Sequence, residues 1–416
     1  MKLRLQIRNF KSIESAELCL NPGLNILVGP NGAGKTCLLS ALKFVRDVFR
    51  LGAAQALARS GGTRHVYNRG HSEIRFSIWQ DYGERTYRRR KYPCQVLWEV
   101  AIAQRGPEKI ATIVEENLKI GLSGTGICRD LLDIAVNRRN LRRIKTRINV
   151  CSPQEVGRDL FSGWASEERS RNKTQLYERF VSYLSRVRKS IRENPDRSLF
   201  PMVASFDEML SRLLYRFLFL NEYNILPEIA RASTEQLPYA QMRPDGGSVS
   251  EVIQALANRH YHKIEDPANI ETEWPDEYGL FYLPHTHRRW YRYRRYEPYG
   301  RKPGRYVIEN ALSNINAEVA AAVSPITSVG VEIDPTNGRR FVVFRTDTET
   351  FYPQEVSDGT MKWLCILVSI FVPYSRVYLL EEPENFLHPW MQQRLVGIMR
   401  DQSRQNAMIY VLTSHR

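Results

Sequence analysis

The chain has 416 residues and a net charge of +15, which is enough for two or three compact units and favours a polyanionic partner such as nucleic acid. No run approaches the roughly 20 apolar residues of a membrane-spanning helix, and residues 1–7 alternate like a strand and unlike a signal peptide. The six cysteines have neither disulfide-framework nor zinc-finger spacing. We therefore expect a cytoplasmic protein with reduced thiols, although a solvated basic surface would give the same net charge.

The first predicted elements are a strand, a glycine-rich loop and a helix. The apolar run 24–28 predicts the strand, and residues 37–45 have helical periodicity. Between them, residues 29–36 read GPNGAGKT and match the phosphate-binding pattern G-x-x-x-x-G-K-[ST] at every fixed position. In such a loop the glycines let backbone N–H groups point inward around an anion, Lys35 reaches the β- and γ-phosphates, and the Thr36 hydroxyl can bind Mg²⁺. The loop predicts binding of a nucleoside triphosphate.

The middle of the chain is expected to change from strands to helices. Residues 73–79 and 96–102 alternate as strands do, whereas residues from about 121 to 270 look helical and basic, as in the stretches 138–145 and 177–192. No heptad pattern is long enough for an extended coiled coil, so a helical insertion would be compact.

Residues 288–296 place five arginines among four aromatic residues. This pattern suits phosphate contacts combined with stacking on single-stranded bases, and it equally suits a protein-docking surface or a solvated basic loop. The two nearby histidine pairs, His260 with His262 and His285 with His287, lack accompanying metal-ligand spacing, so we expect no metal site there.

Three segments near the C-terminus place polar residues at the ends of apolar elements. Ser357 is a good N-cap for a helix expected over about 361–371, and Gly359 would let an anion approach its first turn. The strand 377–380 ends in Glu381 and Glu382, and the strand 408–412 ends in Thr-Ser-His. Such carboxylates lie at the carboxyl edge of a sheet, where the phosphate loop also opens. One of them can hold Mg²⁺ and the next can polarise an attacking water.

The order of these motifs resembles the ATP-binding-cassette ATPases, specifically their SMC/RecF/OLD-like branch. Residues 29–36 correspond to Walker A, 356–360 to the signature motif, 377–382 to Walker B, 383–389 to the D-loop and His415 to the switch histidine. The opening residues 7–13 and the Ser-Gly-Gly at 60–62 also resemble this branch.

The resemblance implies an α/β fold, namely an ABC-type ATPase head with two lobes, mixed β-sheets, flanking helices and a compact helical insertion. We expect residues 1–120 to form lobe I with Walker A. Residues 121–274 would form the mainly helical basic insertion, and residues 275–416 would form lobe II with the signature motif, Walker B and the switch histidine.

The resemblance also assigns roles to individual residues and implies ATP and Mg²⁺ as cofactors. Glu382 would orient the attacking water and His415 would contact the γ-phosphate, while Thr36 and Glu381 would serve the metal. Gln55 is a candidate for the lid glutamine, which has no clear match. The residues expected to contact ATP are Asn31, Gly32, Ala33, Gly34, Lys35 and Thr36 of one chain and Ser357, Asp358 and Gly359 of another.

An ATP-dependent homodimer or higher homo-oligomer follows from that sharing of ATP between chains. The family has aspartate where this chain has Glu381, and the extra methylene leads us to expect slow turnover.

The chain ends at the switch histidine without the nuclease domain of OLD-type ATPases, so we expect a separate effector protein, such as a nuclease. This arrangement resembles ATPase components of bacterial anti-phage systems such as Septu and PARIS. Two alternatives stay open: a RecF-like DNA-repair ATPase, and a nucleotide-locked scaffold with little turnover.

Overall fold

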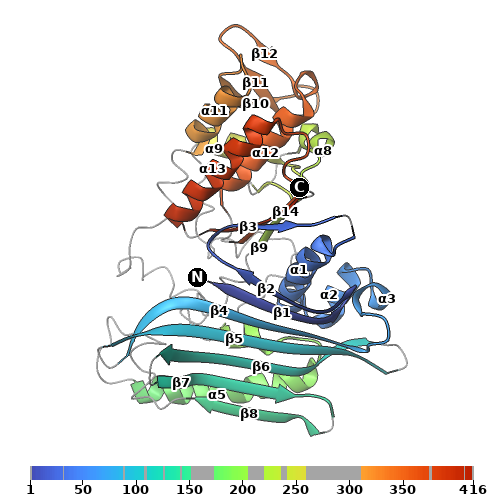
Figure 1. The fold of residues 1–416 in the computed structure, drawn as a ribbon, viewed down its shortest axis with the longest axis vertical. Coiled ribbons are helices and arrows are strands. Elements are labelled where there is room, and N and C mark those ends of the chain that lie inside the picture. Colours follow the sequence, from blue (N-terminus) through green and yellow to red (C-terminus); the bar gives the residue numbers. More distant parts are fainter. Residues whose placement is uncertain are drawn as a thin grey trace. The chain divides into compact units, whose positions relative to one another are not determined.

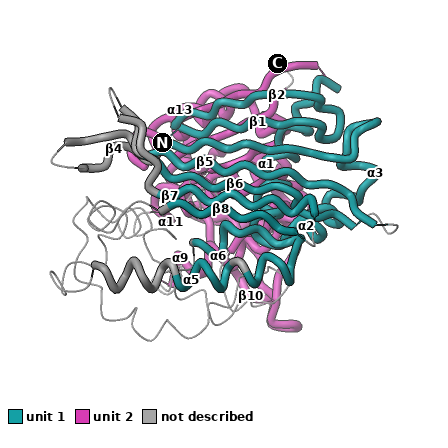
Figure 2. Tube along the Cα trace, turned by 90° about the horizontal axis from the view of Figure 1, so that it is seen from below, with its two compact units in different colours: residues 1–22, 31–220 teal, residues 23–30, 221–416 magenta. Residues whose placement is uncertain are grey.

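The computed structural model of the chain describes residues 2–30, 32–87, 90–106, 110–124, 127–140, 143–150, 173–204, 220–235, 241–258, 311–373, 377–406 and 408–414. These residues belong to two compact units, which Figure 2 shows in different colours. Unit 1 comprises Met1–Pro22 and Asn31–Leu220, and unit 2 comprises Gly23–Pro30 and Asn221–Arg416. The strand before the phosphate loop therefore belongs to unit 2, although the loop's helix belongs to unit 1.

Unit 1 is built on a seven-stranded antiparallel sheet in the order β2-β1-β4-β5-β6-β7-β8 (Figure 1). Its strands are β1 (Leu3–Phe10), β2 (Ile13–Leu20), β4 (Glu73–Tyr87), β5 (Arg90–Arg105), β6 (Ile110–Gly124), β7 (Ile127–Asn137) and β8 (Lys145–Val150). Its helices are α1 (Lys35–Leu51), α2 (Ala53–Arg59), α3 (Thr63–Val66), α5 (Lys173–Glu193) and α6 (Leu199–Ala204).

Alternation along the strands separates a core face from a polar face. In β1, Leu3, Leu5 and Ile7 are buried, while Arg4 and Arg8 are exposed. The core is closed by aromatic residues from the sheet and the helices, including the pairs Phe10–Phe44 at 5.3 Å and Phe49–Phe200 at 4.4 Å between ring centroids. Helices α1 and α6 thus pack on one face of the sheet.

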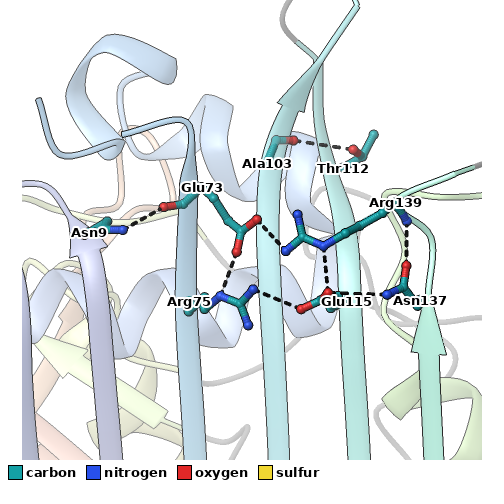
Figure 3. A network of polar contacts seen from close by, with 8 residues as sticks. All are labelled: Asn9, Glu73, Arg75, Ala103, Thr112, Glu115, Asn137 and Arg139. Atoms are coloured by element: carbon teal, nitrogen blue, oxygen red, sulfur yellow. Dashed lines mark hydrogen bonds and ion pairs between the residues drawn. The ribbon is translucent and has the colours of Figure 1, made fainter. Parts of the chain in front are cut away.

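The polar face carries a ring of alternating charges, drawn in Figure 3. Glu73 binds Arg75 at 2.6 Å and Arg139 at 2.8 Å, and Glu115 binds the same two arginines at 3.0 Å and 2.7 Å. The side chains are 23–46% exposed, so water screens each pair and the network contributes little to stability.

A second arginine–glutamate pair is buried in the same unit. The side chains of Arg138 and Glu116 are 1% and 0% exposed and bind each other at 3.0 Å. Arg138 also donates to the carbonyl groups of Pro195 and Arg197, and the Glu116 carboxylate accepts from the Ser198 hydroxyl at 2.5 Å. The pair therefore ties the segment before α6 to strand β6 and the end of β7.

We expect Arg138→Met to lower the free energy of unfolding by about 3–5 kcal/mol, because it leaves the Glu116 carboxylate buried without its counter-charge. The neighbouring substitution Arg139→Met is the matched control, since it removes only exposed ion pairs and should cost less than about 1 kcal/mol. Urea unfolding of the two variants beside the wild type measures both effects. Equal destabilisation by the two substitutions would contradict this role for Arg138.

The sheet extends further along the chain than the sequence predicts. The expected boundary at residue 120 lies within β6, and the stretch 138–145, expected to be helical, follows the end of β7 at Asn137 and reaches the start of β8 at Lys145. Leu132, Ile134 and Val136 are buried at a spacing of two residues, which is the strand period that the neighbouring basic run obscured. The helix expected over 177–192 is confirmed as α5.

Unit 2 contains two sheets. The first has the order β3-β14-β13-β9 and the second the order β10-β11-β12. The strands are β3 (Gly23–Val28), β9 (Leu220–Tyr223), β10 (Ser328–Ile333), β11 (Arg340–Arg345), β12 (Thr350–Phe351), β13 (Val377–Glu381) and β14 (Ile409–Ser414). The helices are α8 (Pro227–Arg231), α9 (Val249–Ala257), α11 (Ala311–Ala322), α12 (Asp358–Phe371) and α13 (Pro389–Asn406), with a 3₁₀ turn η7 (Pro353–Glu355).

The core of unit 2 is formed around α12, in which every residue from Gly359 to Phe371 is buried. Strand β13 is likewise buried over its first four residues, which is typical of a parallel strand covered on both faces. The expected α/β fold with mixed sheets and flanking helices is confirmed. No helix in the described ranges combines the length and apolarity needed to cross a membrane.

Candidate functional site

Three parallel strands of unit 2 bring the predicted motifs to one edge of a sheet. Strand β14 pairs with β13 on one side and with β3 on the other, with Glu381 opposite Thr413 and Ser414 opposite Val28. The chain leaves β3 at this edge and enters the phosphate loop, through Gly29. The start of Walker A, the carboxylate pair and the Thr-Ser tip therefore lie together, as expected for the carboxyl ends of parallel strands.

The phosphate loop has the backbone that its glycines predict. Gly32 and Gly34 have φ angles of 82° and 89°, in the left-handed region that favours glycine. A Cβ atom at either position would meet nothing within 4 Å, so the space beside the loop is open. Helix α1 begins with Lys35 and has no acidic residue in its first turn. This arrangement fits a phosphate group, which helix N-termini and their free N–H groups attract.

Glu382 is held by three different parts of unit 2. Its backbone N–H donates to Thr413 Oγ1 at 3.2 Å, and its carbonyl oxygen accepts from Lys362 Nζ at 2.9 Å. Its carboxylate accepts from Asn385 Nδ2 at 2.7 Å. Its φ of 44° is left-handed, which costs a residue with a Cβ about 1–2 kcal/mol. Strained backbone of this kind is often found at functional sites.

Ser357, in the signature turn formed by residues 356–360, caps α12 as predicted. Its Oγ atom accepts a hydrogen bond from the Thr360 N–H at 3.1 Å. Asp358 forms an ion pair with Arg231, whose guanidinium also donates to the carbonyl groups of Pro353 and Val356 at 2.9 Å and 2.7 Å. Arg231 was not predicted from the sequence, since it lies 127 residues before Asp358.

The structure gives Gly359 an additional role. A Cβ atom there would lie 2.5 Å from the Phe386 carbonyl oxygen, so any larger residue displaces the D-loop backbone. A substitution at Gly359 therefore disturbs packing inside the chain and cannot separately test contact with a nucleotide.

The structure describes only some of the other predicted site residues. Gln55 is exposed on α2, and the Thr36 side chain is exposed at the start of α1. Asn31, His415, residues 288–296 and the two histidine pairs lie outside the described residues. Their roles, and that of Gln55, stay predictions.

The residues expected at the metal fit the coordination habits of Mg²⁺. Among the described residues, no three histidine, cysteine, aspartate or glutamate side chains form a metal-binding group. Mg²⁺ at nucleotide sites needs no such cluster, because it keeps waters and phosphate oxygens and takes only one or two protein ligands. Thr36 and Glu381 supply a hydroxyl and a carboxylate, which are suitable hard oxygen ligands.

Comparisons with known proteins identify matching families and relatives. A family model described as "AAA domain, putative AbiEii toxin, Type IV TA system" matches residues 166–416, and a model described as "AAA domain" matches residues 4–193. The DNA replication and repair protein RecF of Erwinia tasmaniensis and that of Shigella dysenteriae are each 59% identical over 39 residues. Those residues cover 9% of this chain and 11% of each relative, so the match spans about a tenth of their length.

Two solved structures are also similar to the chain. The SMC head bound to the C-winged helix domain of ScpA is 12% identical with a TM-score of 0.43, over 99% of this chain and 89% of that one. The SMC head domain from Thermotoga maritima is 9% identical with a TM-score of 0.33, over 100% of this chain and 90% of that one.

Proposed function

The chain belongs to the family described as "AAA domain, putative AbiEii toxin, Type IV TA system", and on that premise we propose that it binds ATP with Mg²⁺ and hydrolyses the γ-phosphate bond. The observation that carries this proposal is the shared edge of β3, β14 and β13, where the phosphate loop begins and where β13 ends in Glu381, directly before Glu382. A phosphate-binding loop that begins at the sheet edge where paired carboxylates lie has the parts needed for phosphoryl transfer to water.

The proposal gives each residue a separate task. Lys35 and the N–H groups of the loop hold the phosphates, while Thr36 and Glu381 hold Mg²⁺, which neutralises phosphate charge. Glu382 accepts a hydrogen bond from the attacking water and orients it. The remaining contacts to ATP are assigned by resemblance to Asn31, Gly32, Ala33, Gly34 and His415.

We further propose that the protein forms a homodimer around ATP and controls a separate effector, such as a nuclease, in anti-phage defence in the bacterial cytoplasm. In the dimer, Ser357, Asp358 and Gly359 of one chain would cover the ATP held by its partner. The ion pair of Arg231 with Asp358 supports this proposal, because it offsets a negative charge at a helix N-terminus that would otherwise repel phosphate.

Native mass measurement of the full chain tests the assembly. We expect the mass to double when ATP and Mg²⁺ are added, because each nucleotide would bridge two chains. Lys35→Ala is the control and should stay monomeric at the same ATP concentration. Adding the product of a neighbouring gene should yield a larger complex if that product is the effector. A wild-type mass that ATP does not change would contradict the ATP-bridged dimer.

A RecF-like role in DNA repair is the second candidate, favoured by the 59% identity to RecF over 39 residues. It predicts binding to gapped or single-stranded DNA without any partner protein. Binding through the arginines of 288–296 would weaken with salt, with a log–log slope of about −0.7 to −0.9 per phosphate contacted. Replacing Arg292, Arg294 and Arg295 by alanine would then flatten the slope by about two.

A role as a nucleotide-locked scaffold would instead show ATP binding without turnover.

A further inference from the structure

A buried lysine connects α12, the helix that follows the signature motif, to the turn formed by residues 382–386, which we call the carboxylate turn. Lys362 belongs to α12 and is 4% exposed, in a helix that is otherwise mostly apolar. Its ammonium group donates to the Glu382 carbonyl oxygen at 2.9 Å and lies 5.6 Å from the centre of the Phe386 ring. Burial lowers the pKa of Lys362, and the nearby Glu384 and Glu382 carboxylates oppose that shift. An apolar side chain would suit this position better if stability were its only purpose.

The turn that Lys362 contacts has an unusual backbone. Glu382 and Phe386 both have left-handed φ angles, of 44° and 68°, although neither is a glycine. The Glu382 carbonyl oxygen accepts from the Asn385 N–H at 3.1 Å as well as from Lys362. The hydrogen bond from Lys362 thus acts on one of the two peptide groups that flank the Glu382 Cα atom, and the orientation of these groups sets the direction of the Glu382 side chain.

The same turn also rests on the start of α12. The Phe386 carbonyl group lies so close to Gly359 that only a glycine fits there. Lys362 follows Gly359 by three residues, so it projects from the same side of the helix. A shift of the signature turn would therefore move both contacts of the carboxylate turn together.

We propose that Lys362 is a positioning residue, which holds the Glu382 backbone in its left-handed conformation and links the placement of that carboxylate to the signature turn. This inference rests on the proposed function, in which Glu382 orients the attacking water. Lys362 itself touches neither ATP nor water in this proposal. Its effect should therefore appear in turnover and not in ATP binding.

The variant Lys362→Met tests this role, because methionine keeps an apolar stem of similar length and loses the charged donor. We expect kcat for ATP hydrolysis to fall at least tenfold, while KM stays within twofold and the thermal midpoint does not fall. Lys362→Gln is a second variant, in case the first does not fold, and should show the same pattern. Loss of general packing would instead change KM and the thermal midpoint as well.

Ser369→Ala provides a matched control on the same helix. Ser369 lies seven residues after Lys362, is 1% exposed, and donates to the Ile366 carbonyl group of its own helix at 2.7 Å. It should keep the wild-type kcat. A kcat within twofold of the wild type in the two Lys362 variants would overturn the proposal.

The double variant Lys362→Met/Glu382→Gln tests whether Lys362 acts on turnover through Glu382 or independently of it. Residues that act as one unit are non-additive, so Lys362→Met should cause no further loss in that background. A further tenfold loss of kcat in the double variant would overturn the proposal.

If the wild type hydrolyses no ATP, the proposed function fails, and amide hydrogen exchange then tests the positioning of the Glu382 backbone by itself. Lys362→Met should speed exchange over residues 382–387, and unchanged exchange would overturn the inference.

Discussion

Replacing Lys35 by alanine is expected to weaken ATP binding by tenfold to over a hundredfold while the fold persists. A charge-assisted hydrogen bond contributes about 1.5–3 kcal/mol, and each 1.4 kcal/mol is a factor of ten in affinity. Gly32 and Gly34 have open space beside them and α1 has no acidic residue in its first turn, so the start of this helix is suited to a phosphate group. Isothermal titration calorimetry with ATP and Mg²⁺ measures the change.

Lys43→Ala is the matched control for this experiment, because it removes the same charge from the same helix two turns further on. We expect it to bind ATP as the wild type does. Far-ultraviolet circular dichroism of both variants checks that α1 is retained. Equal ATP affinity of Lys35→Ala and Lys43→Ala would remove the basis for a nucleotide site at this loop.

Replacing Glu382 by glutamine is expected to leave ATP affinity within about twofold and to slow hydrolysis by about 10²–10⁴-fold, the usual contribution of a group that accepts a proton or orients water. Glutamine has the same shape, and its side-chain oxygen can still accept the hydrogen bond from Asn385 Nδ2. The lost carboxylate charge is therefore the main change. A phosphate-release assay at saturating ATP measures the rate.

This variant should also accumulate the ATP-bound assembly, because binding continues while turnover nearly stops. Glu384→Gln is the control, since it removes a carboxylate two residues further along the same turn and should hydrolyse ATP at close to the wild-type rate. If Glu382→Gln matches the wild type and Glu384→Gln does not, the assignment of the water-orienting carboxylate is wrong.

Much of the candidate site could be predicted from local sequence. The phosphate loop depends on backbone conformations within eight residues, and Gly32 and Gly34 have left-handed φ angles, which glycine adopts readily. The Ser357 cap joins side chain and backbone only three residues apart. The apolar runs before Glu381 and Thr413 predicted parallel strands and a shared edge, because buried strands of this kind end in polar residues at the carboxyl side of a sheet.

Other features depend on residues that are distant in the sequence, and local patterns carry no sign of them. Arg231 pairs with Asp358 across 127 positions, and Lys362 donates to the Glu382 carbonyl oxygen across 20 positions. The sequence predicts that Gly359 lets an anion approach the first turn of α12, and the nearby Phe386 carbonyl group gives a second reason for glycine that no local pattern contains.

The extent of the unit 1 sheet shows the same division between local and distant information. The sequence predicted a helical insertion after residue 120, where β7 and β8 extend the sheet to Val150. A basic run has the same pattern on a helix and at a strand end, so only the pairing of β7 with β6 and of β8 with β7 distinguishes the two structures. The burial of Arg138 depends likewise on Glu116 and on the segment before α6, which the folded chain alone brings together. Local chemistry thus predicts which groups can hold a phosphate, while packing between distant segments decides which side chains keep those groups in place.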